Sequence, residues 1–230
     1  MEDLKREDLS PIVVNSVFIS STVRDLHAFR QFAVWIEQSR FGVKESFPEA
    51  DWSSVAPEEI VAECRRRVLF ADAFVLLLGP WAGWTPPGYT ESITHLEFQW
   101  ARSHFATLHQ RIEKLAEKMN ARHLLGLYSP RILVLARGRH YQRSDGTDDF
   151  EDLPSLQKEV DQTLAKLPKM EREKTGATLK RFHQEVFEAV GTHEATFSTF
   201  DFTARLGVEV LNTMQRWHEF SAECLRLLVT

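Results

Sequence analysis

Residues 76–101, LLLGPWAGWTPPGYTESITHLEFQWA, contain the features that decide the fold and the candidate site. An apolar run ends at Gly79 and is followed by a loop rich in glycine, proline and tryptophan. A helix is predicted to begin near Ser92, with Glu97 on its first turns. A buried strand, a loop able to approach a ligand closely and a carboxylate beside an apolar face therefore lie within one short segment.

Short apolar segments alternate with helical segments on both sides of this stretch. Strands are predicted at residues 13–20, 43–47, 73–78 and 131–136, and helices at residues 25–38, 57–69 and 92–119. The strand at 73–78 is apolar on both faces, as in the middle of a parallel sheet. This alternation predicts an α/β fold with an open, flavodoxin-like parallel sheet. In that strand order the first and third strands are neighbours, so the loops at 20–22 and 79–89 should converge on one crevice.

The character of the sequence changes after Arg137. Residues 12–137 are predicted to form the α/β domain, and residues 138–230 a mainly helical extension that packs on it. In this extension an exposed loop is expected at residues 138–154, and a charged surface or connector at 169–174. Helices are expected at residues 156–167, 179–190 and 202–228, and an edge strand at 195–200.

Composition excludes several classes of protein. The chain has 230 residues, of which 43% are hydrophobic and 27% charged, as is ordinary for a globular protein. A net charge of -5 argues against nucleic-acid binding, and no apolar run is long enough to span a membrane. The charged first residues are no secretory signal, and Cys64 and Cys224 are expected to be reduced thiols. We therefore expect a cytoplasmic protein.

Several chemistries have no motif in this chain. The nine histidines are scattered, and neither an HExxH helix, paired cysteines nor a calcium loop occurs. The phosphate-binding GxxxxGK[ST] loop and the GxSxG nucleophile elbow are also absent. The sequence therefore predicts no metal site and no bound cofactor.

Glu97 has two interpretations at this stage. On a helix beginning near Ser92 it lies at the edge of an apolar stripe made by Ile93, Leu96 and Trp100. Burial there would disfavour the ionised carboxylate unless a donor faces it, which makes Glu97 a functional candidate. Alternatively, residues 94–97 fit a capping box, in which Glu97 reaches back to the backbone of the first turn.

The two flanking loops are equally open to interpretation. Hydroxyls and free N–H groups at Ser20, Ser21 and Thr22 could hold a phosphate or ribose, or could cap the following helix. Trp81, Trp84 and Tyr89 could wall a pocket and stack on a base, or could cover the core.

Three quoted motifs carry a resemblance to a known family. They are VFISSTVRDL at 17–26, DAFVLLLGPWAGW at 72–84 and SITHLEFQWA at 92–101. Together they resemble the TIR-like domain of unknown function that opens with FISSTxxDL and is often fused to signalling NTPases. That domain is similar in fold to TIR domains and nucleoside deoxyribosyltransferases. The resemblance covers about residues 12–137, and the tyrosine of the family's usual GxxYG strand ending is absent from residues 79–83.

The resemblance implies a site and an activity. Glu97 matches the glutamate that contacts the ribose at the scissile bond, and it is the expected catalytic residue. The expected substrate-binding residues are Ser20, Ser21, Thr22, Gly79, Trp81, Trp84 and Ser92. The expected activity is cleavage of an N-glycosidic bond, with NAD as first candidate substrate and nucleosides as second, in bacterial defence or stress signalling. Alternatives are a self-associating signalling module, a sensor that binds a nucleotide without cleaving it, and partnership with a signalling NTPase.

Overall fold

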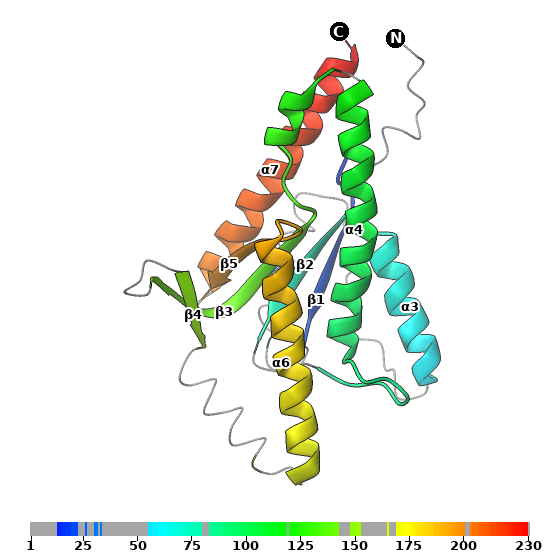
Figure 1. The fold of residues 1–230 in the computed structure, drawn as a ribbon, viewed down its shortest axis with the longest axis vertical. Helices are drawn as coiled ribbons and strands as arrows, with labels where there is room; N and C mark the ends of the chain where they lie inside the picture. The colour runs from blue at the N-terminus through cyan, green and yellow to red at the C-terminus, as the bar shows by residue number, and fades with distance from the viewer. Residues whose placement is uncertain are drawn as a thin grey trace.

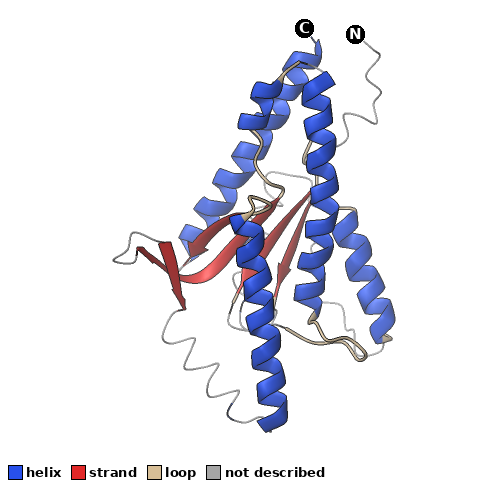
Figure 2. Cartoon of the chain, in the orientation of Figure 1, coloured by secondary structure: helices blue, strands red, loops and turns tan. Residues whose placement is uncertain are grey.

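The fold is an open parallel sheet with helices on both faces (Figures 1 and 2). The computed structural model describes residues 13–22, 26, 30, 31, 33, 55–79, 83–118, 120–142, 148–152, 165, 169–200 and 203–229. The elements are β1 Val17–Ser21, α3 Pro57–Leu69, β2 Ala73–Leu78, α4 Ile93–Lys118, a 3-10 helix η2 at Arg122–Gly126, β3 Ile132–Gln142, β4 Asp148–Asp152, α6 Lys169–Gly191, β5 Thr196–Phe200 and α7 Thr203–Val229.

The strands β1, β2, β3 and β5 lie in this order and pair in parallel, and β4 pairs antiparallel with the end of β3. A flavodoxin-like sheet gives this order to its first, third, fourth and fifth strands. The predicted fold class is therefore confirmed, and β1 and β2 are the neighbours that the prediction requires. In their register Ser20 lies opposite Leu76, and Ser21 lies opposite Leu77.

Alternate residues of the strands build two hydrophobic layers. On one face, α3, α4 and α6 cover the sheet through buried residues that include Phe74, Phe98 and Phe182. On the other face α7 packs on the sheet, and Trp217 of α7 donates its indole N–H to the Pro130 carbonyl at 2.9 Å. The even-numbered residues of β1, Phe18 among them, face the α4 layer.

Most apolar segments that the structure describes are found close to where they were predicted, although β1 begins at Val17 and not at residue 13. β2 coincides with the predicted strand at 73–78, and α3 and α4 differ from their predicted ranges by at most one residue. The predicted edge strand at 195–200 is confirmed as β5, which pairs with β3. Beyond these, α6 and α7 add helices to opposite faces of the same sheet.

Of two predictions for the polar segments, one is wrong and one is right in part. Residues 138–154 were expected to form a loop, but β3 continues to Gln142 and β4 pairs with its end in antiparallel register. This hairpin is polar and acidic, so no apolar alternation indicates it in the sequence. Residues 169–174 are the first turns of α6, since lysine, glutamate, arginine and methionine all favour helix. Lys169 and Glu173 are exposed, so the charged-surface interpretation is confirmed and the connector interpretation is wrong.

Some predictions concern residues outside the described part of the chain. The strand at 43–47 lies wholly outside it, as does all but one residue of the helix at 156–167. Of the helix at 25–38, residues 26, 30, 31 and 33 are described, and they are helical. Among the described residues, no helix combines the length and apolarity needed to cross a bilayer.

Candidate functional site

Ser20 brings a hydroxyl to the carboxyl end of β1, inside the protein. The strand is VFISS, and all five residues are buried. Because side chains alternate along a strand, Ser20 shares the face of Phe18 and points toward the α4 layer. The Ser20 side chain is fully buried, so its hydroxyl needs a polar partner.

That partner is Glu97 on the first turns of α4. Ser20 Oγ donates to Glu97 Oε2 at 2.5 Å, and Glu97 is only 6% exposed. The helix is capped instead by Ser92, whose hydroxyl accepts the backbone N–H of His95 at 3.3 Å. The capping-box interpretation of Glu97 is therefore wrong, because its carboxylate is directed at the sheet and α4 begins at Ile93.

The apolar stripe of α4 differs from the predicted one. Leu96 is buried, but Ile93 and Trp100 are only half-buried. The buried face instead runs through Phe98, Ala101 and Phe105. Residues 94–98 are all buried, because β1, α3 and α6 surround the start of the helix, so Glu97 is enclosed more deeply than an edge position implies.

Burial dominates the electrostatics of this carboxyl group. It raises the pKa of Glu97 to about 7, against the lowering effects of the Ser20 hydroxyl, the Arg30 guanidinium and the Cys64 thiol. Cys64, on the buried stripe of α3, is 2% exposed. Burial, and next the charge of Glu97, raises the pKa of the Cys64 thiol far above its usual value. Glu97 can thus hold or release a proton near neutral pH, whereas Cys64 stays a thiol.

Neither Cys64 nor Arg30 was predicted as a site residue. In the sequence Cys64 is only one member of the apolar stripe Val61, Cys64 and Val68, which gives no sign of a carboxylate neighbour. Arg30 donates from Nη1 to the Ser21 hydroxyl at 3.2 Å, which brings a cation to the end of β1. Its position nine and ten residues after the two serines, on the following helix, was the available signal.

Of the other predicted residues, Ser21, Thr22 and Gly79 lie at the carboxyl ends of β1 and β2. Ser21 and Thr22 are buried, and Gly79 is buried directly after β2. Trp81 lies outside the described residues. Trp84 is 46% exposed and Tyr89 is 38% exposed, so neither of these two rings covers the core.

The loop after β2 approaches the site closely at Gly83. This glycine has a φ of 88°, which other residues rarely adopt. A Cβ atom built on it would lie 2.9 Å from Thr94 Oγ1 and 3.3 Å from Thr22 Cγ2. Thr22 and Thr94 therefore leave room only for a glycine at this position. The next residue, Trp84, accepts the backbone N–H of Ile93 with its carbonyl at 2.8 Å.

A separate cavity of about 1350 Å³ lies elsewhere on the molecule. Its walls come from α4 from Arg102 onward, from the start of β3, from the end of α6 and from β5 with the turn before it. None of the predicted site residues lines it. Within the described ranges, no cluster of three or more His, Cys, Asp and Glu side chains could hold a metal ion.

These features define an α/β protein with a flavodoxin-like sheet and a buried, titratable carboxyl group where β1, β2 and α4 meet. Residues 16–123 match the model of a family described as a domain of unknown function, DUF4062. The match covers slightly less than half of the chain and includes Ser20, Cys64 and Glu97, whereas β3 and all later elements lie beyond it. No curated protein and no solved structure matches the chain.

Proposed function

We propose that the protein cleaves the N-glycosidic bond of a nucleotide, with NAD as the first candidate substrate, and that Glu97 is its catalytic residue. The observation that carries this proposal is the hydrogen bond of 2.5 Å between Ser20 and Glu97 at the carboxyl edge of a parallel sheet. Open α/β sheets bind their ligands at this edge, where the strand order reverses. The resemblance of the sequence to TIR-like domains supports the same residue.

The chemistry suits a single carboxyl group. The nicotinamide of NAD is a positively charged pyridinium, so the C1′–N bond can break with its electron pair leaving on a neutral base and needs no general acid. The barrier is then the positive charge that develops on the ribose. A carboxylate held beside C1′ stabilises this charge in surroundings from which water is excluded.

Water completes the reaction. As its oxygen bonds to C1′, a proton must leave, and the Glu97 carboxylate accepts it. The products are ADP-ribose, nicotinamide and one proton that Glu97 later releases to solvent. A pKa of about 7 suits both the acceptance and the release of this proton at neutral pH.

The neighbouring residues have supporting roles in this scheme. The Ser20 hydroxyl fixes Glu97 Oε2, and a ribose hydroxyl would compete with the Cys64 thiol for the carboxylate. Arg30 places a positive charge beside Ser21, where a phosphate oxygen of the substrate would be attracted. Trp84 presents an exposed ring on the loop after β2, which could stack on a base.

The proposal is tested with purified protein and NAD, with the products separated by chromatography and identified by mass. Nicotinamide and ADP-ribose should accumulate with the wild type and not with Glu97→Gln, which keeps the shape of the side chain. Parallel incubations with nucleosides and deoxynucleosides test the second substrate class. Release from every substrate at equal rates in both proteins would exclude Glu97 as the catalytic residue.

A second candidate function is a nucleotide sensor that binds its ligand without cleaving it. The enclosure of Glu97 favours it, because the carboxylate already has donors in Ser20 and Cys64 and is 6% exposed. Saturable binding of NAD with the ligand recovered intact would identify this function. A defined oligomer that neither binds nor consumes nucleotides would point instead to a self-associating signalling module.

A further inference from the structure

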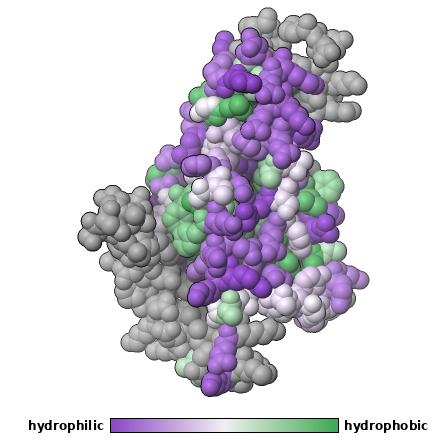
Figure 3. All heavy atoms as spheres, viewed as in Figure 1, coloured by the Kyte–Doolittle hydropathy of each residue, from purple (hydrophilic) through white to green (hydrophobic). Residues whose placement is uncertain are grey.

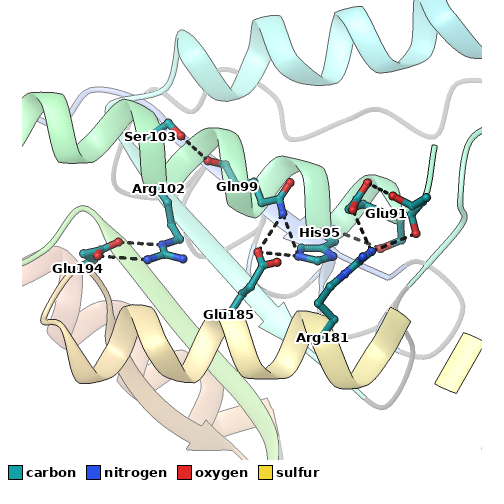
Figure 4. A network of polar contacts seen from close by, with 10 residues as sticks. Glu91, His95, Gln99, Arg102, Ser103, Arg181, Glu185 and Glu194 are labelled. Carbon is teal, nitrogen blue, oxygen red and sulfur yellow. Dashed lines mark hydrogen bonds and ion pairs between the residues drawn. The ribbon is translucent and has the colours of Figure 1, made fainter. Parts of the chain in front are cut away.

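The first turns of α4 are held from the side opposite the sheet contact with Ser20. Side chains of α6 make polar contacts along α4, and the contacts nearest the candidate site involve Glu91, His95, Gln99, Arg181 and Glu185 (Figure 4). We call these five residues the α6 clamp. Two of them, Arg181 and Glu185, lie beyond the residues that match the family model.

The inner part of the clamp is built around a buried histidine. His95 is fully buried and stacks on the ring of Phe182, with ring centroids 4.7 Å apart. Its Nε2 lies 2.8 Å from Glu185 Oε2, and Gln99 Nε2 donates to the same oxygen at 2.9 Å. Burial alone would raise the pKa of Glu185, but the hydrogen bonds from Gln99 and His95 lower it below its usual value. An ionised carboxylate thus fixes two consecutive turns of α4.

The outer part of the clamp holds the loop before α4. Arg181 Nη2 lies 2.9 Å from Glu91 Oε1 and donates to the Thr90 carbonyl at 3.4 Å. Both partners belong to the loop that joins β2 to α4. The contact is half-exposed, and the surrounding face of α4 and α6 is largely hydrophilic (Figure 3). A partly exposed ion pair such as Arg181 and Glu91 adds little to the free energy of unfolding. Its relevance to the site lies in where it holds the loop before α4.

The clamped loop leads directly to the candidate site. The described part of the loop before α4, residues 83–92, begins at Gly83, whose close approach to Thr22 and Thr94 ties it to both β1 and α4. Between these ends, the N–H of Ile93 is bonded to Trp84. A loop fixed by α6 at one end and by site residues at the other would restrict the access of water to Ser20 and Glu97.

We propose that Arg181 and Glu185 are positioning residues of the candidate site, and that α6 keeps the loop of residues 83–92 closed over the pair Ser20 and Glu97. Release of the clamp opens the loop and admits water or ligand to the carboxylate. The C-terminal part of the chain thereby controls a site whose own residues all lie within the matched domain. Only the catalytic consequence of this control rests on the proposed function.

The interface provides a matched control at its far end. Arg102 of α4 is bonded to Glu194 after α6 through Nε at 2.8 Å and Nη2 at 3.2 Å. This ion pair also lies between the α4 and α6 regions and is partly exposed, as is the pair Arg181 and Glu91. It lies about three turns along α4 from Glu91, away from the loop. If the two ion pairs only stabilise the fold, removal of either pair should have a similar effect on the pKa of Glu97. If Arg181 positions the site, only removal of the pair Arg181 and Glu91 should change that pKa.

The experiment is a ¹³C NMR titration of the glutamate carboxyl groups in the full-length protein, with the Glu97 signal assigned by its loss in Glu97→Gln. Wild type should show a Glu97 pKa of about 7. Arg181→Ala and Glu185→Ala should each lower it by about one unit, because water then reaches the carboxylate. Arg102→Ala should leave it unchanged.

Two results would overturn the proposal: equal shifts in all three variants, or no shift in any of them. Arg181 is half-exposed, so its variant remains folded and informative even where Glu185→Ala does not. The titration needs no turnover. Absence of nicotinamide release would therefore count against the proposed function and leave this result standing.

Discussion

Ser20 and Glu97 are 77 residues apart in the sequence, yet a hydrogen bond of 2.5 Å joins them across the interface of β1 and α4. The bond links the end of a buried strand to the start of the helix that follows the neighbouring strand. It also places the most strongly perturbed carboxyl group of the candidate site next to a hydroxyl donor in the protein interior.

Glu97→Gln should stabilise the protein at alkaline pH. The pKa of Glu97 is about 7 in the folded state and near 4.5 in the unfolded chain, so the folded state holds its proton more tightly. Its stabilising contribution is complete below pH 4.5 and is lost as pH rises through 7. Relative to wild type, the variant should therefore gain about 3 kcal/mol in unfolding free energy between pH 4.5 and pH 8.5.

Urea unfolding of both proteins at several pH values measures this difference. The other titrating groups are the same in both proteins, so their contributions cancel in the difference between the two unfolding free energies. A difference in unfolding free energy that stays constant across this range would show that Glu97 titrates normally in the folded state.

Ser20→Ala should raise the pKa of Glu97 further, because the Ser20 hydroxyl is the strongest of the groups that lower it. A loss of about 1–3 kcal/mol in unfolding free energy is expected above pH 8, where the carboxylate is ionised. Ser21→Ala is the matched control, since the Ser21 hydroxyl is bonded to Arg30 instead. The NMR titration of Glu97 distinguishes the two variants, and identical titrations would contradict the assigned contact.

Gly83→Ala and Gly88→Ala separate backbone strain from close packing. Both glycines have positive φ, 88° and 82°, so each variant incurs a conformational cost of about 1 kcal/mol. Only at Gly83 would the added Cβ atom meet a neighbour, since none lies within 4 Å at Gly88. Urea unfolding should therefore show a larger loss for Gly83→Ala, and equal losses would place Gly83 away from Thr94.

Cys64 and Cys224 should be unreactive in the folded protein. Both are free and buried, and burial raises the pKa of each thiol, that of Cys224 to about 11. The thiolate is the reactive form, so a thiol reagent at pH 8 should label neither residue until denaturant is added. Rapid labelling of Cys64 in native buffer would mean that the cluster around Glu97 is open to solvent.

Sequence patterns predicted the sheet well where hydrophobic burial determines the structure. β2 is apolar on both faces because it lies in the middle of the sheet. Its first and last residues could therefore be predicted from the ends of the apolar run. The hairpin of β3 and β4 and the first turns of α6 were missed, since they are polar and their formation depends on pairing or helix propensity.

The candidate site was predicted only in part. Glu97 and the serines of β1 were identified from their segments, but which serine faces the helix depends on strand register. Cys64 and Glu185 are brought to the site by packing of helices distant in sequence, and nothing in their own segments indicates it. Arg30 follows the serines closely in the sequence, but its contact with Ser21 depends on how the chain folds back on the end of β1. Ser92 could be assigned as the cap of α4 only once the first residue of the helix was known to be Ile93.

The central claim is that Glu97 is the catalytic carboxylate of an N-glycosidase. The most direct measurement is nicotinamide release from NAD by wild type and Glu97→Gln between pH 5.5 and 8.5. Wild-type activity should rise with pH through about 7, as Glu97 becomes ionised, and the variant should be at least about 100-fold slower at pH 8. Equal release by the two proteins, or none from a wild type that binds NAD and leaves it intact, would contradict the claim.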